Sequence, residues 1–127
     1  MITSIIATWI FSGLIYQGKP FPLPNPNLKI YFQFDDKGTD TLLYFRDGEQ
    51  GHCRRSAQYT FATNQLTQTV TWIDPDNAEW CAQDPDMQMG AKSTTAAWFE
   101  DGHLHLQFQM GDQDIIYVWD KLVDKPK

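Results

Sequence analysis

The 127 residues include ten basic and sixteen acidic side chains, which give a net charge of −6 at neutral pH. This charge repels a phosphate backbone, so the composition excludes a protein that binds nucleic acid through a basic surface. A hydrophobic content of 42% with 20% charged residues excludes a disordered chain, and the length fits a single domain over residues 1–127.

The first predicted element is a strand over residues 3–11, an apolar segment that contains Trp9. No lysine or arginine precedes it and no small-x-small cleavage motif follows it closely, so it does not match a signal peptide. No stretch approaches the roughly 20 apolar residues that a membrane-spanning helix needs. We therefore expect no membrane span. A leader peptide that was removed before residue 1 is compatible with this sequence.

A long connection is predicted next, over Ser12–Asn27. Prolines occupy every second position from Pro20 to Pro26, and a proline cannot donate a hydrogen bond to a sheet. Alternating prolines favour an extended backbone without regular helix. We expect this segment to behave as a lid over one end of the domain.

The clearest pattern is strict alternation of apolar and polar residues, as in Leu28–Phe34 and His103–Met110. A period of two is typical of antiparallel strands with one buried face. Thirteen aspartates against three glutamates also favour turns over helices, and the chain is predicted to be all-β. The predicted strands are 3–11, 28–35, 40–47, 52–62, 65–73, 92–100, 103–110 and 113–121.

Short turn motifs separate most of these strands. Asp47-Gly48, Thr63-Asn64 and Asp101-Gly102 each stand between alternating segments, and such residues tolerate the positive φ angles of tight hairpins. The exception is Asp74–Gly90, a long loop with five acids and no base. Its Asp-Pro pairs suggest either calcium ligands or ordinary solvated turns, and no EF-hand spacing is present.

The two cysteines, Cys53 and Cys81, are far apart in the sequence, unlike a CxxC redox or metal motif. We predict a structural disulfide between them, which would tie the acidic loop to the strand over 52–62. A disulfide favours a secreted or periplasmic location, and the alternative is a pair of reduced thiols in a cytosolic protein.

Eight strands joined mostly by hairpins predict an antiparallel up-and-down barrel, with a β-sandwich as the alternative. In Ala7-Thr8-Trp9 the chain resembles the lipocalin-like (calycin) barrels, which usually have Gly-x-Trp in their first strand. Lipocalins also place a basic residue near that tryptophan after the last strand, where this chain has Lys121. The resemblance implies that Ser12–Asn27 covers the open end of the barrel.

Candidate chemical sites are few. His103 and His105 share one strand face, a spacing that metal sites use, with Asp114 or His52 as a third ligand; the alternative is an outward polar face. No nucleophile motif or phosphate-binding glycine loop is present, and we expect neither enzymatic activity nor a cofactor.

Two adjacent arginines, Arg54 and Arg55, begin the strand over 52–62. Neighbouring strand residues point to opposite faces, so one of the two points into the barrel if the strand is regular. An inward arginine could hold a ligand carboxylate, and the alternative is that both reach solvent at the strand end.

The resemblance implies a binding protein for a small apolar ligand; the alternative is a cell-envelope interaction or inhibitor module with a filled barrel and an unknown protein partner. Because aromatic side chains are bulky, we expect at most a small apolar pocket near the Pro-rich loop. The residues predicted to line it are Trp9, Phe32, Phe34, Tyr59, Trp72, Phe108, Tyr117 and Trp119.

Overall fold

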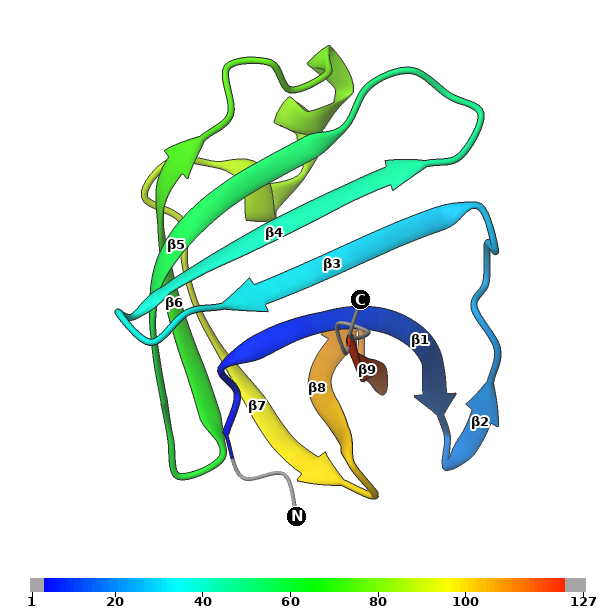
Figure 1. The fold of residues 1–127 in the computed structure, drawn as a ribbon. Helices are drawn as coiled ribbons and strands as arrows, with labels where there is room; N and C mark the ends of the chain where they lie inside the picture. The colour runs from blue at the N-terminus through cyan, green and yellow to red at the C-terminus, as the bar shows by residue number, and fades with distance from the viewer. Residues whose placement is uncertain (1–3, 123–127) are drawn as a thin grey trace, which may run out of the picture.

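The computed structural model describes residues 4–122, which form a closed antiparallel barrel of eight strands with one short extra strand (Figure 1). Neighbours along the chain pair with each other, and the last strand closes on the first. The predicted up-and-down barrel is confirmed, and the β-sandwich is excluded. The barrel strands are β1 (Ala7–Tyr16), β3 (Leu28–Phe34), β4 (Thr39–Arg46), β5 (Cys53–Ala62), β6 (Gln65–Ile73), β7 (Lys92–Glu100), β8 (His103–Met110) and β9 (Gln113–Leu122).

Most predicted strand ends agree with the structure to within one residue, and β6, β7 and β8 have the predicted bounds. The first strand does not: it was predicted over 3–11, where residue 3 lies outside the described residues, but β1 runs to Tyr16. Its pairing with β9 shifts register between Phe11 and Gly13, which leaves Ser12 as the extra residue of a β-bulge. The bulge interrupts the alternation, and the sequence pattern therefore stops early.

Gly13 lies at a point of β1 where the backbone of another strand comes so close that no side chain fits. A Cβ atom at this position would lie 2.9 Å from the carbonyl oxygen of Phe21 on the extra strand β2 (Lys19–Phe21). Strand β2 pairs with the end of β1, so the predicted connection Ser12–Asn27 contains the end of one strand and all of another. Pro20 is tolerated in β2 because this strand lies at an edge of the sheet.

The hairpin turns have the backbone angles that their residues favour. Thr63 and Asn64 have φ angles of 54° and 57°, and Asp101 and Gly102 have 53° and 81°. Two consecutive positive φ angles make the turn that matches the twist of antiparallel strands. These turns set the register of β5 with β6 and of β7 with β8.

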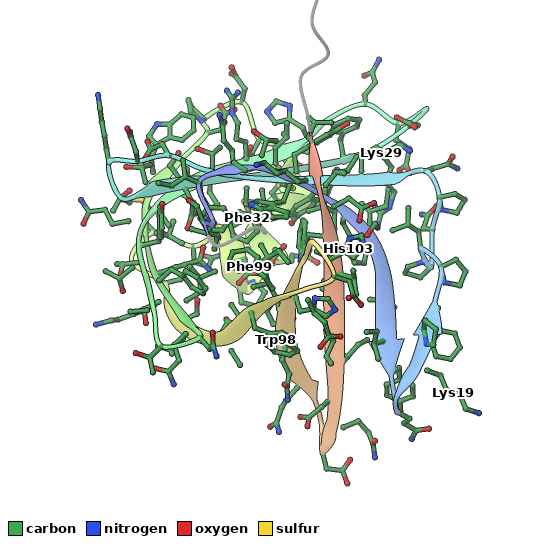
Figure 2. All side chains as sticks on the ribbon, turned by 60° about the horizontal axis from the view of Figure 1, so that its bottom comes forward. Lys19, Lys29, Phe32, Trp98, Phe99 and His103 are labelled. Carbon is green, nitrogen blue, oxygen red and sulfur yellow. A yellow bond between two sulfur atoms is a disulfide. The ribbon has the colours of Figure 1, made fainter. Side chains whose placement is uncertain are left out.

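One end of the barrel is sealed around Trp9. This side chain is fully buried, its indole N–H donates to the carbonyl oxygen of Ile5 at 3.0 Å, and its ring lies 5.8 Å from that of Phe99. Trp9 is also the register partner of Lys121, which lies within β9 and not after the last strand. Figure 2 shows Phe32 and Phe99 inside the barrel and Lys19 and Lys29 projecting outward.

The acidic loop between β6 and β7 carries two short 3-10 turns, η1 (Glu79–Gln83) and η2 (Pro85–Met87). Both are far too short to cross a bilayer, and within residues 4–122 no helix is long and apolar enough to do so. Strand β6 pairs with β7 as far as Thr69, and the end of the loop continues this pairing, with the Val70 N–H donating to the Ala91 carbonyl oxygen at 2.9 Å. The loop lies at the barrel end opposite Trp9.

Candidate functional site: a cavity in the barrel

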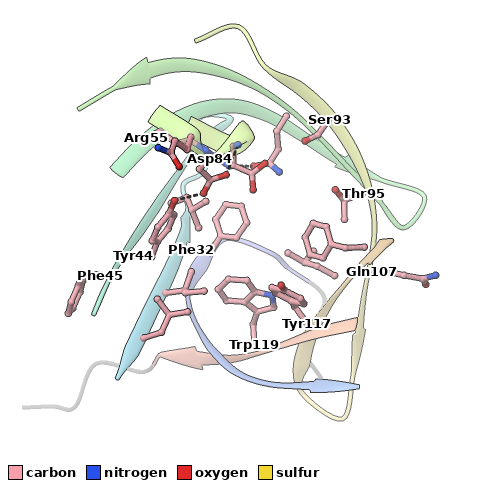
Figure 3. A pocket seen from close by; sticks show the side chains of 18 of the residues that line it. Phe32, Tyr44, Phe45, Arg55, Asp84, Ser93, Thr95, Gln107, Tyr117 and Trp119 are labelled. Atoms are coloured by element: carbon pink, nitrogen blue, oxygen red, sulfur yellow. Dashed lines mark hydrogen bonds between the residues drawn. The ribbon is translucent and has the colours of Figure 1, made fainter. Parts of the chain in front are cut away.

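The barrel contains a cavity of about 850 Å³ that lies between the sealed end and the acidic loop and is partly open to solvent. The sequence predicted at most a small pocket near the Pro-rich loop, and the cavity is larger than that prediction. Part of the reason is that several aromatic side chains expected inside lie elsewhere. Figure 3 shows the cavity with its aromatic residues on one side and the loop on the other.

Four of the predicted ligand-contacting residues line this cavity: Phe32, Phe108, Tyr117 and Trp119. Phe32 and Trp119 meet edge to face with their ring centroids 5.6 Å apart, and Phe108 and Tyr117 meet in the same way at 5.0 Å. These contacts fix the rings in place as a rigid apolar wall. Alternation on β3, β8 and β9 was sufficient to find them.

Three further predicted residues lie deeper, in the sealed end. Trp9 is fully buried, and Phe34 packs edge to face against Tyr59 with centroids 5.0 Å apart. The Tyr59 hydroxyl donates to the carbonyl oxygen of Asp35. None of the three lines the cavity. They pack beneath the residues that form its floor and support them.

Trp72 was predicted to point inward, and this prediction was wrong. The side chain is 41% exposed and lies outside the barrel, with the Arg54 guanidinium 5.6 Å from its ring centroid. The cause is a second bulge: Ser56 pairs with Trp72 and Ala57 pairs with Val70, so Thr71 has no partner on β5. Val70 points inward, and the extra residue turns Trp72 to the outer face.

One wall of the cavity carries a buried charged network. Arg55 points inward and is only 3% exposed; its Nη1 donates to Asp40 and its Nη2 donates to Gln68 Oε1 at 3.0 Å. The guanidinium also lies 5.5 Å from the ring centroid of Phe32. The alternative that both arginines reach solvent is therefore wrong for Arg55, while Arg54 lies outside.

The Asp40 carboxylate supplies the charge that balances Arg55. Burial raises the pKa of Asp40 to about 6, and the neighbouring guanidinium opposes that rise. Asp40 is 1% exposed and its second oxygen has no partner among the described residues. Asp40 thus neutralises Arg55, which weakens the attraction of this arginine for a ligand carboxylate, while Arg55 Nε has no hydrogen-bond partner among the described residues.

The acidic loop closes part of the cavity mouth, and two of the contacts that hold it there are a disulfide and a side-chain hydrogen bond. The Cys53–Cys81 disulfide joins η1 to the start of β5, with the Cα atoms 5.6 Å apart, and confirms the predicted pairing. The Tyr44 hydroxyl on β4 donates to the Asp84 carboxylate. Burial, and then this carboxylate, raise the pKa of Tyr44. We call residues 74–90 the acidic lid.

Asp74 holds the first turn of the acidic lid. Its carboxylate accepts hydrogen bonds from His52 Nε2 at 3.0 Å, from Arg54 Nε at 3.0 Å and from the Asp76 backbone N–H at 2.9 Å. The Asp76 amide and then His52 contribute most to holding the pKa of Asp74 below its ordinary value. Such a group stabilises the fold above its unfolded pKa, and the contribution is lost as pH falls through the folded pKa.

We therefore predict that Asp74→Asn destabilises the protein at neutral pH and that the loss shrinks in acid. The unfolding free energies of the wild type and the variant, measured in urea, should converge as pH falls from about 5 to about 2. Asp76→Asn, which removes an exposed carboxylate from the same loop, is the control and should not change this pH dependence. A constant difference between wild type and Asp74→Asn at all pH values would contradict the prediction.

The candidate metal ligands do not come together. His103 pairs with Asp120, with Nδ1 and Oδ1 2.6 Å apart, while His105 is buried and stacks on Trp98 with centroids 5.6 Å apart. Asp114 instead accepts a hydrogen bond from Gln109. Across residues 4–122, no three His, Cys, Asp or Glu side chains converge to hold a metal ion, and this applies to the acidic lid as well.

Sequence reasoning missed the polar part of the cavity. Ser93 and Thr95 on β7 and Asp84 and Asp86 in the acidic lid line it, although the resemblance implied that Ser12–Asn27 would cover the opening. The predicted disulfide was the available signal, because it places Cys81 against the mouth of the barrel. A second, more open apolar hollow of about 660 Å³ does lie against the Pro-rich segment, lined by Leu14, Tyr16, Phe21, Pro22, Leu23, Pro24, Gln113 and Ile115.

Two solved structures share this fold. A lipocalin-like protein from Bacteroides uniformis aligns with a TM-score of 0.61 at 14% identity, over 93% of this chain and 98% of that protein. An uncharacterized protein from Bacteroides eggerthii aligns with a TM-score of 0.58 at 13% identity, over 94% and 100%. No family model and no curated protein matches the sequence. Identities this low show the fold alone, so the chain has the lipocalin-like barrel fold.

Proposed function

We propose that the protein binds a small, largely apolar molecule in the barrel and does not change it chemically. The observation that carries this proposal is the cavity of about 850 Å³, because ligand sites in proteins are typically concave, mostly apolar and about 300–1,000 Å³ in volume. The rigid aromatic wall gives such a molecule contact area, and the acidic lid supplies a few polar groups.

The alternative, an interaction or inhibitor module of the cell envelope, required a filled barrel. The cavity weighs against that alternative. The exposed rings of Trp72 and Trp80 are each covered in part by an arginine, with guanidinium-to-centroid distances of 5.6 Å and 5.9 Å. They therefore do not form the bare aromatic patch that a protein-binding surface would favour.

We propose an extracytoplasmic location, secreted or periplasmic. The Cys53–Cys81 disulfide supports it, because disulfides form and persist in oxidising compartments and are rare in the cytosol. The net charge of −6 supports the further proposal that nucleic acid is not a partner. The ligand is then a molecule that the protein meets outside the cytoplasm.

The proposal is tested by titrating the protein with the uncharged fluorophore N-phenyl-1-naphthylamine. We expect saturable binding with a stoichiometry of about one. The dissociation constant should be about micromolar, because apolar contacts supply the affinity. Ser93→Trp places a large ring in the cavity and should weaken binding about tenfold or more by occupying the site.

Gln58→Trp is the matched control, because Gln58 is exposed on β5 and its side chain points away from the interior. This variant should bind the fluorophore like the wild type. Absence of saturable binding, or equal affinity of both tryptophan variants, would leave the filled-module alternative ahead.

A further inference from the structure

The charges that face the cavity do not balance. Four charged residues line it: Arg46, Arg55, Asp84 and Asp86. Arg55 is neutralised by Asp40 behind it, and Arg46 lies at the exposed rim with its guanidinium 5.9 Å from the ring centroid of Trp80. With Asp40 included, the charges at the cavity therefore sum to −1, because the rim cation Arg46 offsets only one of the two carboxylates of the acidic lid.

The two lid carboxylates differ in what they contact. Asp84 accepts hydrogen bonds from the Tyr44 hydroxyl and, through its other oxygen, from the Asp86 backbone N–H at 2.8 Å. The Asp86 carboxylate has no side-chain hydrogen bond and no ion pair within residues 4–122, although its surface stays accessible from the cavity. It is the one cavity-lining carboxylate among these residues that is left to receive a partner.

The Asp86 carboxylate interacts electrostatically with side chains on several strands. Its charge contributes to the raised pKa of Tyr44 on β4 and of Tyr117 on β9, and burial followed by the Asp84 charge raises the pKa of Asp86 itself. Arg55 on β5 opposes the last shift. A cation bound between these groups would relieve the repulsion, whereas a second anion would increase it.

The walls beside these carboxylates are aromatic. Tyr44 and Trp80 lie at the mouth with their ring centroids 6.4 Å apart, and Tyr117 lies across the cavity. Arg46 already covers part of the Trp80 ring, so the faces left for a ligand cation are those of Tyr44 and Tyr117. Aromatic faces attract cations, most strongly where water is excluded. A carboxylate ligand would be repelled by the acidic lid, and the cavity arginines attract it weakly, because Arg55 is paired with Asp40 and Arg46 lies at the exposed rim.

We propose that the barrel binds an amphiphile with a cationic amine, whose ammonium group pairs with Asp86 in the acidic lid and whose apolar body lies against Phe32, Phe108 and Trp119. This inference rests on the proposed function and names its ligand class. The overall charge of −6 assists the capture of cations at low ionic strength. It also means that fatty-acid carboxylates are poor ligands of this barrel.

The experiment compares three probes with one twelve-carbon chain: dodecylamine, 1-dodecanol and laurate. Each displaces N-phenyl-1-naphthylamine from the full chain at pH 7.4, at physiological salt and below its critical micelle concentration. We expect the amine to bind about tenfold or more tighter than laurate, with the alcohol between them, because only the amine gains a partly desolvated ion pair.

Asp86→Asn separates the cavity carboxylate from the general charge of the protein. It should weaken dodecylamine about fivefold to tenfold and leave 1-dodecanol unchanged, since the apolar wall is intact. Asp76→Asn makes the same change of net charge on an exposed residue of the acidic lid, outside the cavity. This control should bind all three probes like the wild type.

The outcomes separate the two proposals. If none of the probes nor the fluorophore binds saturably, both the binding function and the ligand class are overturned. If dodecanol or laurate binds as tightly as the amine, or if Asp86→Asn and Asp76→Asn weaken the amine equally, the binding function stands and the amine specificity is wrong.

Discussion

Removing the Cys53–Cys81 disulfide should lower the free energy of unfolding by about 3–4 kcal/mol. The two cysteines are 28 residues apart in the sequence, and a crosslink over that distance removes much of the conformational freedom of the unfolded chain. The Cys53→Ala, Cys81→Ala double variant, unfolded in urea beside the oxidised wild type, measures the difference. The wild type with its disulfide reduced should lose a similar amount.

The same experiment reports on the acidic lid. Hydrogen exchange should rise in residues 74–90 of the double variant while the backbone amides of β8 and β9 stay protected, because those strands do not contact the crosslink. A change in unfolding free energy below about 1 kcal/mol would contradict the prediction and indicate that Asp74 and Tyr44 hold the lid without help.

A second large effect is expected at the buried ion pair. Arg55→Met should cost about 3–5 kcal/mol at pH 7.5, because it leaves the Asp40 carboxylate buried without its counter-charge. Arg55 opposes the rise in the pKa of Asp40, so its removal moves this pKa above the wild-type value of about 6. A carboxyl group whose folded pKa exceeds its unfolded pKa loses stability as pH rises through the folded value.

The destabilisation by Arg55→Met should therefore be largest above neutral pH and should shrink toward about pH 4, where Asp40 is protonated. Urea unfolding at pH 7.5 and pH 4.5 measures it. The Asp40→Leu, Arg55→Met double variant should recover most of the loss, because apolar residues replace both charges. A double variant as unstable as the single one at both pH values would show that lost packing, not the unpaired charge, is the cause.

The strands of this barrel were predictable because they are local in sequence. Alternation in β3 and β8 and the Asp101-Gly102 turn depend on neighbouring residues, and each was assigned with little error. The two bulges, at Ser12 and Thr71, are set by pairing with another strand. Nothing in the local pattern marks them, and they account for the short first strand and for the wrong placement of Trp72.

The volume of the cavity could not be predicted from the sequence for a similar reason. The aromatic content of the chain suggested a nearly filled barrel, but volume depends on where each ring goes. Trp72 lies outside, Trp98 stacks on His105 and Trp80 belongs to the acidic lid, so these rings fill none of the interior's central space. Asp86 could not have been placed from the sequence, because a loop of this kind is positioned by tertiary contacts.

The pairing of β1 with β9 has a consequence for how the chain reaches its native state. The hydroxyl of Ser12 donates to the carbonyl oxygen of Val118 across 106 residues, and β1 shares eight register pairs with β9. During synthesis β1 emerges before every other strand of the barrel, yet its partner on this side is the last of them, so the barrel cannot close until β9 has been made. Such non-local pairing folds slowly. Until then the β9 side of β1 is an edge with unpaired backbone N–H and C=O groups, and such an exposed edge favours aggregation before the barrel closes.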